Sequence, residues 1–283
     1  MLFIILSILL FSYNNVLWKK NIKTISIPFL VSYRAFFTST ISLAILFVFF
    51  NIDAITPITS WRIILGSLFG VIGLFSMLSV IKKASLQWLG IYNLIGIAFT
   101  IPYLWVFENI EIQNSIIGLS IIVLGFISFI YTNKKKQLKI SLKQHLSLLL
   151  MTFSFSCSAL LHWKNLSLNV PPLLIISSQE FLVFLTGVVF TFKQGEGKLY
   201  SSDLIKYFKN VLLMSVVIFL AFLFNLIGLK EINPIITSIL FLASPLTTIL
   251  FSALFFKEKI SSKNILFISI IVLGAFILHY QST

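Results

Sequence analysis

The sequence predicts an all-α integral membrane protein with ten transmembrane helices, arranged as two inverted repeats of five helices. Three observations lead to this fold class: an apolar composition, ten apolar segments of spanning length and a duplication between the two halves. Of the 283 residues, 58% are hydrophobic and only 10% are charged, whereas soluble domains carry about 25% charged residues. The composition therefore excludes an ordinary cytosolic enzyme and indicates a bilayer as the surrounding solvent.

Ten segments are long and apolar enough to span a membrane. A spanning helix needs about 20 largely apolar residues, because the hydrocarbon core is about 30 Å thick and each residue rises about 1.5 Å. The predicted spans are residues 1–18, 28–50, 62–81, 84–107, 112–131, 144–163, 172–192, 207–229, 233–256 and 264–280. The connections are short, so we expect one integral unit that carries no soluble domain.

The first segment is interpreted as a helix of the mature protein. It lacks the basic start and the A-x-A-like site of a secretory signal, and it ends in Trp18-Lys19-Lys20. Aromatic and basic residues also meet at other span ends, for example in Trp163-Lys164. We interpret these residues as the belt that anchors helices at the membrane interface.

The two halves of the chain share a repeated pattern. The letters S-I-I-V-L-G occur at residues 120–125 and again at 269–274, and the same register pairs Phe107 with Phe256. The predicted organisation is a first repeat at residues 1–131, a basic connecting loop at 132–143 and a second repeat at 144–283. Because five is an odd number, the two copies cross the membrane in opposite directions, as in transporters that alternate access around a central site.

At this level the chain resembles the drug/metabolite transporter superfamily, specifically its EamA-like ten-helix branch. The resemblance covers the whole chain and is carried by the span count, the duplication and the residues that follow here. These are the stretch from Glu108 through Gln113 to Gly118, the stretch Leu242-Ala243-Ser244-Pro245 followed by Phe256-Lys257-Glu258, and Arg34 in the second helix.

The resemblance implies a fold and an activity. Helices one to four and six to nine would surround a central cavity, and helices five and ten would lie outside it or form a homodimer contact. The implied activity is transport of small organic metabolites such as amino acids, in a bacterial inner (plasma) membrane. Related four-helix multidrug transporters use an acidic residue in helix one, and the first helix here has none, so proton-coupled drug efflux is not implied.

Two ionisable residues stand well inside predicted spans. Such residues are costly in a membrane unless they are paired or hydrated, which makes them candidates for function. We predict that Glu180 carries a coupling proton or anchors a substrate cation. Arg34 either meets Glu180, shares a zwitterionic substrate with it, or extends to the interface.

Neutral polar residues lie on several predicted helix faces. Tyr92, Gly96, Thr100 and Tyr103 follow helical spacing on the fourth span. The predicted substrate-binding or coupling residues are Glu180, Arg34, Asn14, Asn15, Tyr92, Asn93, Tyr103, Asn225 and Ser244. Pro102 and Pro245 interrupt the fourth and ninth spans, and we interpret them as gating kinks.

Other function classes have less support. An intramembrane enzyme would need a metal cluster, paired carboxylates or a Ser-His pair, and His145, His162 and His279 fall near span ends without acidic neighbours. We therefore expect no enzyme, no metal and no cofactor. A transporter that exports an amino acid or a similar metabolite is favoured. A carrier for uptake or exchange of a metabolite, including a nucleotide-sugar-like one, and a receptor or helper subunit without transport activity stay open as alternatives.

The net charge of +13 predicts an orientation. In a soluble protein it would suggest a nucleic-acid partner, but here most of the basic residues gather in particular loops. The connections after odd-numbered spans hold 17 of the 21 Lys and Arg residues and those after even-numbered spans hold 3. The positive-inside rule therefore places the odd connections in the cytoplasm and both termini outside, although the resemblance implies cytoplasmic termini. No nucleic acid is expected as a partner.

Overall fold

The protein is helical throughout the part of the chain that the computed structural model describes. That part comprises residues 2–49, 57–108, 115–133, 140–231, 237, 241, 243–257 and 261–282, and it contains no strand. The helices are α1 (Leu2–Asn21), α2 (Ile27–Phe49), α3 (Pro57–Ile81), α4 (Leu86–Leu94), α5 (Gly96–Glu108), α6 (Ser115–Asn133), α7 (Leu142–Ser167), α8 (Pro172–Lys193), α9 (Leu199–Ser202), α10 (Leu204–Glu231), α12 (Ala243–Phe256) and α13 (Ser262–Ser282).

Six of these helices are long and apolar enough to cross a membrane: α1, α2, α3, α7, α8 and α10. Shorter apolar helical stretches follow residues 117–132, 247–256 and 262–274. A bilayer core contains no water to satisfy free backbone groups, so helices with internal hydrogen bonds suit this environment. The predicted class of an all-α membrane protein is confirmed at this level.

Local sequence explains where several helices begin. Ser85 caps α4 by accepting a hydrogen bond from the Gln87 backbone, and Ser141 forms a capping box with Gln144 at the start of α7. Pro172 stands at the first position of α8, where proline's missing N–H is not needed. The capping box starts the sixth predicted span two residues earlier than hydropathy suggested.

The fourth predicted span, residues 84–107, is not continuous. Helix α4 ends at Leu94. The backbone nitrogen of Ile95 donates a hydrogen bond of 3.1 Å to the Tyr92 carbonyl, three residues earlier, where an α-helix would use the carbonyl four residues earlier. Helix α5 then starts at Gly96 and contains Pro102. The interruption thus lies at Ile95, about two helical turns before the predicted kink at Pro102. Most of the first part of the ninth predicted span lies outside the described residues, and Pro245 stands in the first turn of α12.

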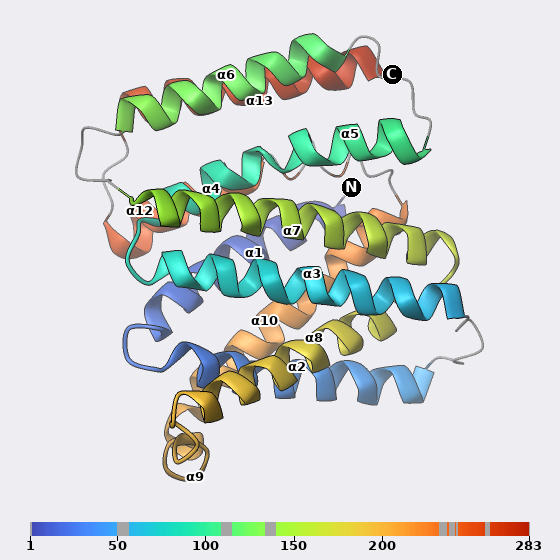
Figure 1. Cartoon of the computed structure of the whole chain (residues 1–283), viewed down its shortest axis with the longest axis vertical. Coiled ribbons are helices and arrows are strands. Elements are labelled where there is room, and N and C mark those ends of the chain that lie inside the picture. Colours follow the sequence, from blue (N-terminus) through green and yellow to red (C-terminus); the bar gives the residue numbers. More distant parts are fainter. Residues whose placement is uncertain are drawn as a thin grey trace.

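Helices of the first half of the sequence pack mainly against helices of the second half (Figure 1). Helix α1 packs on α10 and α12, α2 packs on α8, α3 packs on α7 and α8, and α6 packs on α13. Figure 1 shows α6 and α13 running together at one edge of the bundle, with α2 and α8 toward the opposite edge. Helices from the first and second halves of the sequence are therefore interleaved.

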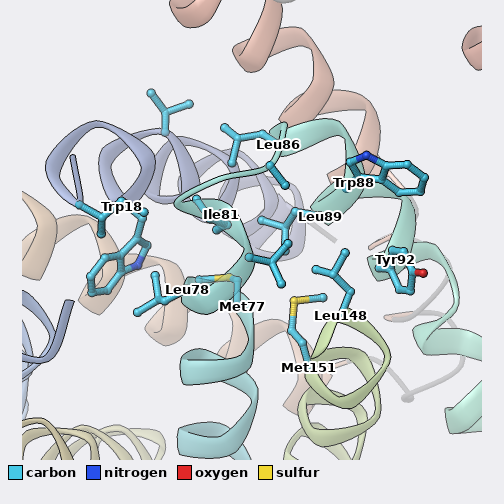
Figure 2. Packing of buried hydrophobic residues seen from close by; sticks show 14 of the residues in the cluster. Trp18, Met77, Leu78, Ile81, Leu86, Trp88, Leu89, Tyr92, Leu148 and Met151 are labelled. Atoms are coloured by element: carbon cyan, nitrogen blue, oxygen red, sulfur yellow. The ribbon is translucent and has the colours of Figure 1, made fainter. Parts of the chain in front are cut away.

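Two clusters of buried apolar side chains stabilise this arrangement. The larger joins the ends of α1 and α3 and the whole of α4 to the first halves of α2, α7 and α10, and the smaller lies among α2, α3, α7, α8 and α10. Figure 2 shows part of the larger cluster, in which Trp18 of α1 lies with Met77, Leu78 and Ile81 of α3 and Leu86 of α4. Burial of such side chains contributes about 25 cal/mol per Å² when the unfolded chain exposes them to water.

The repeated S-I-I-V-L-G stretches meet each other in the α6–α13 pair. A Cβ atom built on Gly125 would lie 2.7 Å from Ile271 Cγ1, and one on Gly274 would lie 2.9 Å from the Gly118 carbonyl oxygen. Both glycines therefore allow a close approach that a larger residue would prevent.

We expect Gly274→Val to lower the free energy of unfolding by about 1–3 kcal/mol, because the new side chain would meet backbone that cannot move aside locally. The measurement is denaturant unfolding of the purified protein in mixed micelles. Leu273→Val, at a neighbouring position that is exposed, serves as the control and should change the unfolding midpoint little. Equal effects of the two substitutions would contradict the close approach.

Candidate functional site

A cavity of about 280 Å³ lies in the middle of the bundle, between helices of both sequence halves. Side chains from α1, α2, α3, α4, α5, α7, α8, α10 and α12 reach its wall. Its polar lining consists of Asn14, Asn15, Arg34, Asn93, Thr100, Thr152, Ser156, Ser158, His162, Gln179, Glu180, Asn225, Thr237 and Ser244. Ligand pockets commonly measure about 300–1,000 Å³, so this volume suits a small ligand.

Arg34 and Glu180 form an ion pair in the wall of this cavity. Arg34 Nη2 lies 2.8 Å from Glu180 Oε2, and both side chains are only 2% exposed. Arg34 lies on α2 and Glu180 on α8, the helices that pack on each other. The arginine side chain is long enough to reach Glu180 on the neighbouring helix. Its burial excludes the alternative in which Arg34 extends to the membrane interface.

Neighbouring residues hold Arg34 in place. The guanidinium carbon of Arg34 lies 5.5 Å from the centre of the Trp18 ring, a cation–π contact made by the helix α1. Ser215 of α10 donates a hydrogen bond of 3.0 Å to the backbone carbonyl of Arg34. The interpretation of Trp18 as an interfacial anchor is wrong, because this tryptophan is 1% exposed and packs inside the protein.

Several buried polar atoms of the cavity have no hydrogen-bond partner among the described residues. On the donor side these are Nε and Nη1 of Arg34. On the acceptor side they include Oδ1 of Asn14 and Oδ1 of Asn225. Unsatisfied buried groups are rare in folded proteins because each carries a desolvation penalty. These atoms therefore mark the place where a polar ligand would gain most binding free energy by forming hydrogen bonds.

Gln179 and His162 form a second polar contact in the cavity wall. His162 Nε2 donates to Gln179 Oε1 over 2.8 Å, joining α7 to α8. Room for this pair comes from α3, since a Cβ atom on Gly66 would lie 2.8 Å from His162 Cε1 and one on Gly70 would lie 2.8 Å from Gln179 Cδ. Sequence reasoning missed both residues, although the polar run Ser177-Ser178-Gln179-Glu180 in an apolar span is a signal that could have identified Gln179.

Hydroxyl groups attach neighbouring helices to the interrupted helix. Thr152 of α7 donates to the Tyr92 carbonyl over 3.0 Å, and Ser156 donates to the Gly96 carbonyl over 3.2 Å. A similar contact occurs in the other half, where Ser12 of α1 donates to the Ser244 carbonyl at the start of α12 over 3.4 Å. In these hydrogen bonds the hydroxyl groups donate to carbonyl groups at the interruption between α4 and α5 and at the start of α12.

We expect Thr152→Val combined with Ser156→Ala to lower the free energy of unfolding by about 1 kcal/mol, since interhelical hydrogen bonds in membranes contribute about 0.6 kcal/mol each on average. The measurement is denaturant unfolding in micelles. Thr40→Val is the matched control, because the exposed Thr40 hydroxyl bonds only to the Phe36 carbonyl of its own helix. A control that loses as much stability as the double variant would show that the interhelical bonds contribute nothing specific.

The structure brings seven of the nine predicted binding residues to the cavity. These are Glu180, Arg34, Asn14, Asn15, Asn93, Asn225 and Ser244. Tyr92 instead packs in an aromatic cluster with Trp88 and Phe126, and its hydroxyl lies 2.5 Å from His145 Nδ1. Tyr103 is not among the lining residues either. The predicted stripe assumed one continuous helix, and the interruption at Ile95 separates Tyr92 from Gly96 and Thr100.

Within the described ranges, no three His, Cys, Asp or Glu side chains gather as a metal site would require. The contacts of the cavity are instead an ion pair, amides, hydroxyls and aromatic rings. Such a set can bind an organic ligand through charge-assisted hydrogen bonds and apolar contact.

Fold and site together define an integral membrane protein whose helices surround a small, polar and largely buried cavity. Residues 142–280 match the EamA-like transporter family. This match lies in the second half of the chain and supports the predicted membership of the drug/metabolite transporter superfamily. No curated protein in the comparison matches the chain.

A solved crystal structure of another protein has a similar fold. The TM-score is 0.67 at 14% sequence identity, and the match covers 98% of this chain and 94% of the other. At this level of identity the likeness concerns the fold alone.

Proposed function

We propose that the protein is a secondary transporter that moves a small organic metabolite, an amino acid or a similar compound, out of the cell by alternating access. The observation that carries the proposal is the buried Arg34–Glu180 pair in the wall of a cavity shared by both sequence halves. Ionisable residues within a membrane protein are costly to bury and mark substrate or ion pathways. The family adds support, since its members are transporters by name.

We propose further that the two halves are inverted repeats. In the proposed repeat, α1 corresponds to α7, α2 to α8 and α3 to α10. Exchanging these helices turns the α3–α7 contact into the α1–α10 contact and the α3–α8 contact into the α2–α10 contact, and all four contacts are observed. The same exchange leaves the α2–α8 and α6–α13 pairs unchanged. The packing in the repeated six-residue stretches supports the same relation, because Gly125 lies against Ile270 and Ile271 while Gly274 lies against Ile121 and Ile122. Inverted repeats allow one cavity to open to either side by rocking of similar units.

The size and charge of the cavity favour a small metabolite over a nucleotide-sugar-like substrate. A diphosphate group would need several cations, whereas Arg34 is the only Lys or Arg among the described lining residues. The volume of about 280 Å³ also suits a compound of amino-acid size.

The proposed orientation places the basic connections in the cytoplasm and both termini outside. The connections α1–α2, α3–α4 and α8–α10 lie on one side of the molecule in Figure 1, and they carry exposed lysines such as Lys23, Lys83 and Lys198. The asymmetry of the basic residues supports this orientation. A C-terminal reporter that is active only in the cytoplasm should be inactive, and activity of that fusion would reverse the orientation.

The test of transport is an assay in proteoliposomes that contain the purified protein. Vesicles are loaded with labelled amino acids and related metabolites, and efflux and uptake are followed with and without a pH gradient. We expect at least one substrate to move far faster than in empty vesicles, and Glu180→Gln to reduce its rate at least tenfold. Failure of every amino acid and related metabolite to move would overturn the proposed function and favour a receptor or helper subunit. An unchanged rate and pH dependence in Glu180→Gln would overturn the site.

A further inference from the structure

We infer that Arg34 and Glu180 together select the charge type of the ligand. A zwitterion opens their ion pair, placing its carboxylate on Arg34 and its ammonium group on Glu180. This inference rests on the proposed transport function and deepens it, because it states which ligands the cavity accepts and how they are oriented.

The charge balance of the cavity is the first argument. Arg34, Glu180 and His162 are the ionisable side chains among its described lining residues. Arg34 and Glu180 balance each other as a pair, and His162 donates from Nε2 to Gln179 while its Nδ1 has no partner among the described residues. A ligand with a net charge would leave an uncompensated charge in a buried site, whereas a zwitterion keeps the total at zero.

The unpartnered atoms are the second argument. Arg34 contacts Glu180 through Nη2, so Nε and Nη1 are each left as a donor for a ligand carboxylate oxygen, in a charge-assisted hydrogen bond. An ammonium group has three N–H donors. Glu180 and the unpartnered Oδ1 atoms of Asn14 and Asn225 offer three acceptors around the same cavity.

The remaining wall indicates the rest of the ligand. Phe11, Leu74, Ile218 and Phe222 contribute apolar surface to the cavity. Trp18 lies over the guanidinium group of Arg34 and keeps it oriented when the ion pair with Glu180 opens. An amino acid with an apolar side chain fits these surfaces, and we use leucine and phenylalanine as probes.

The experiment measures binding of matched probes to the purified full-length protein in a neutral detergent by isothermal titration. Each amino acid is compared with its deaminated acid and its decarboxylated amine: leucine with 4-methylpentanoate and 3-methylbutylamine, phenylalanine with 3-phenylpropanoate and phenethylamine. We expect the wild-type protein to bind at least one of the two zwitterions at least tenfold more tightly than either of its analogues.

Substitutions should change the preferred charge type. Glu180→Gln leaves the cavity with an unbalanced cation, so it should bind the deaminated acid more tightly than the zwitterion. Arg34→Gln should instead favour the amine. Glu196→Gln is the matched control, because the Glu196 carboxylate accepts a hydrogen bond from Ser26 outside the cavity, and it should keep the wild-type order.

The inference is overturned when Glu180→Gln keeps the wild-type order of affinities, or when the wild-type protein prefers neither zwitterion to its analogues. If Arg34→Gln does not fold, the Glu180→Gln titration decides alone. The two failures are distinguishable: a protein that transports an amino acid but shows no reversal contradicts only this inference, whereas a protein that transports nothing contradicts the proposed function.

Discussion

Arg34→Met alone should lower the free energy of unfolding by about 3–5 kcal/mol, because it leaves the buried carboxylate of Glu180 without its partner. Combining it with Glu180→Leu should recover most of that loss, since replacement of both partners by apolar residues removes the uncompensated charge. Denaturant unfolding in mixed micelles measures both effects.

Transport by the same variants separates stability from function. The double variant should fold and yet transport less than a tenth of the wild-type rate, because the groups that bind the ligand are gone. A double variant that folds and transports normally would show that the ion pair is only a structural contact. A double variant as unstable as Arg34→Met would show that the pair is not what the single substitution disrupts.

Gly187→Val should reduce transport at least tenfold and lower the free energy of unfolding by about 1–3 kcal/mol. A Cβ atom at Gly187 of α8 would lie 2.8 Å from the backbone nitrogen and 3.0 Å from the Cα atom of Ser32 on α2. Backbone atoms cannot rotate out of the way as a side chain can, so α2 and α8 would have to move apart. Ser32 lies two residues before Arg34, and the separation would therefore lengthen the ion pair.

Thr186→Val is the control for this prediction, because its hydroxyl bonds to the Leu182 carbonyl within α8 and the substitution preserves its shape. Both variants are compared by unfolding in micelles and by the proteoliposome assay. Normal transport by Gly187→Val would contradict the importance of the close approach of α2 and α8.

Arg34 and Glu180 could be identified from the sequence because a membrane makes isolated charges conspicuous. Asn14, Asn15, Asn93, Asn225 and Ser244 follow similar logic, since polar side chains in apolar spans gather at helix contacts or cavities. The sequence also predicted that Arg34 could meet Glu180, because helix length fixes the depth of each residue. The functional roles of these residues stay predictions until transport is measured.

Other residues could not be placed from sequence alone. Trp18 and His162 stand near helix ends, where tryptophan usually marks the interface, and only the packing of α1, α3, α7 and α8 shows that both are buried. The interruption at Ile95 has no proline at that position to predict it, and hydroxyl groups of α7 donate hydrogen bonds to carbonyl groups on both sides of it. Both features involve contacts between segments that are distant in the sequence, which no local pattern reveals.

The interleaved pairing of the helices has a consequence for the synthesis of the protein. Helices α1, α2, α3 and α6 find their main partners, α10, α8, α7 and α13, in the part of the chain that the ribosome makes later. When α2 enters the bilayer, Arg34 has no counterion, because α8 has not yet been translated. Early insertion intermediates must therefore keep this arginine near headgroups, water or the insertion machinery, and assembly of the native bundle waits for the second half of the chain.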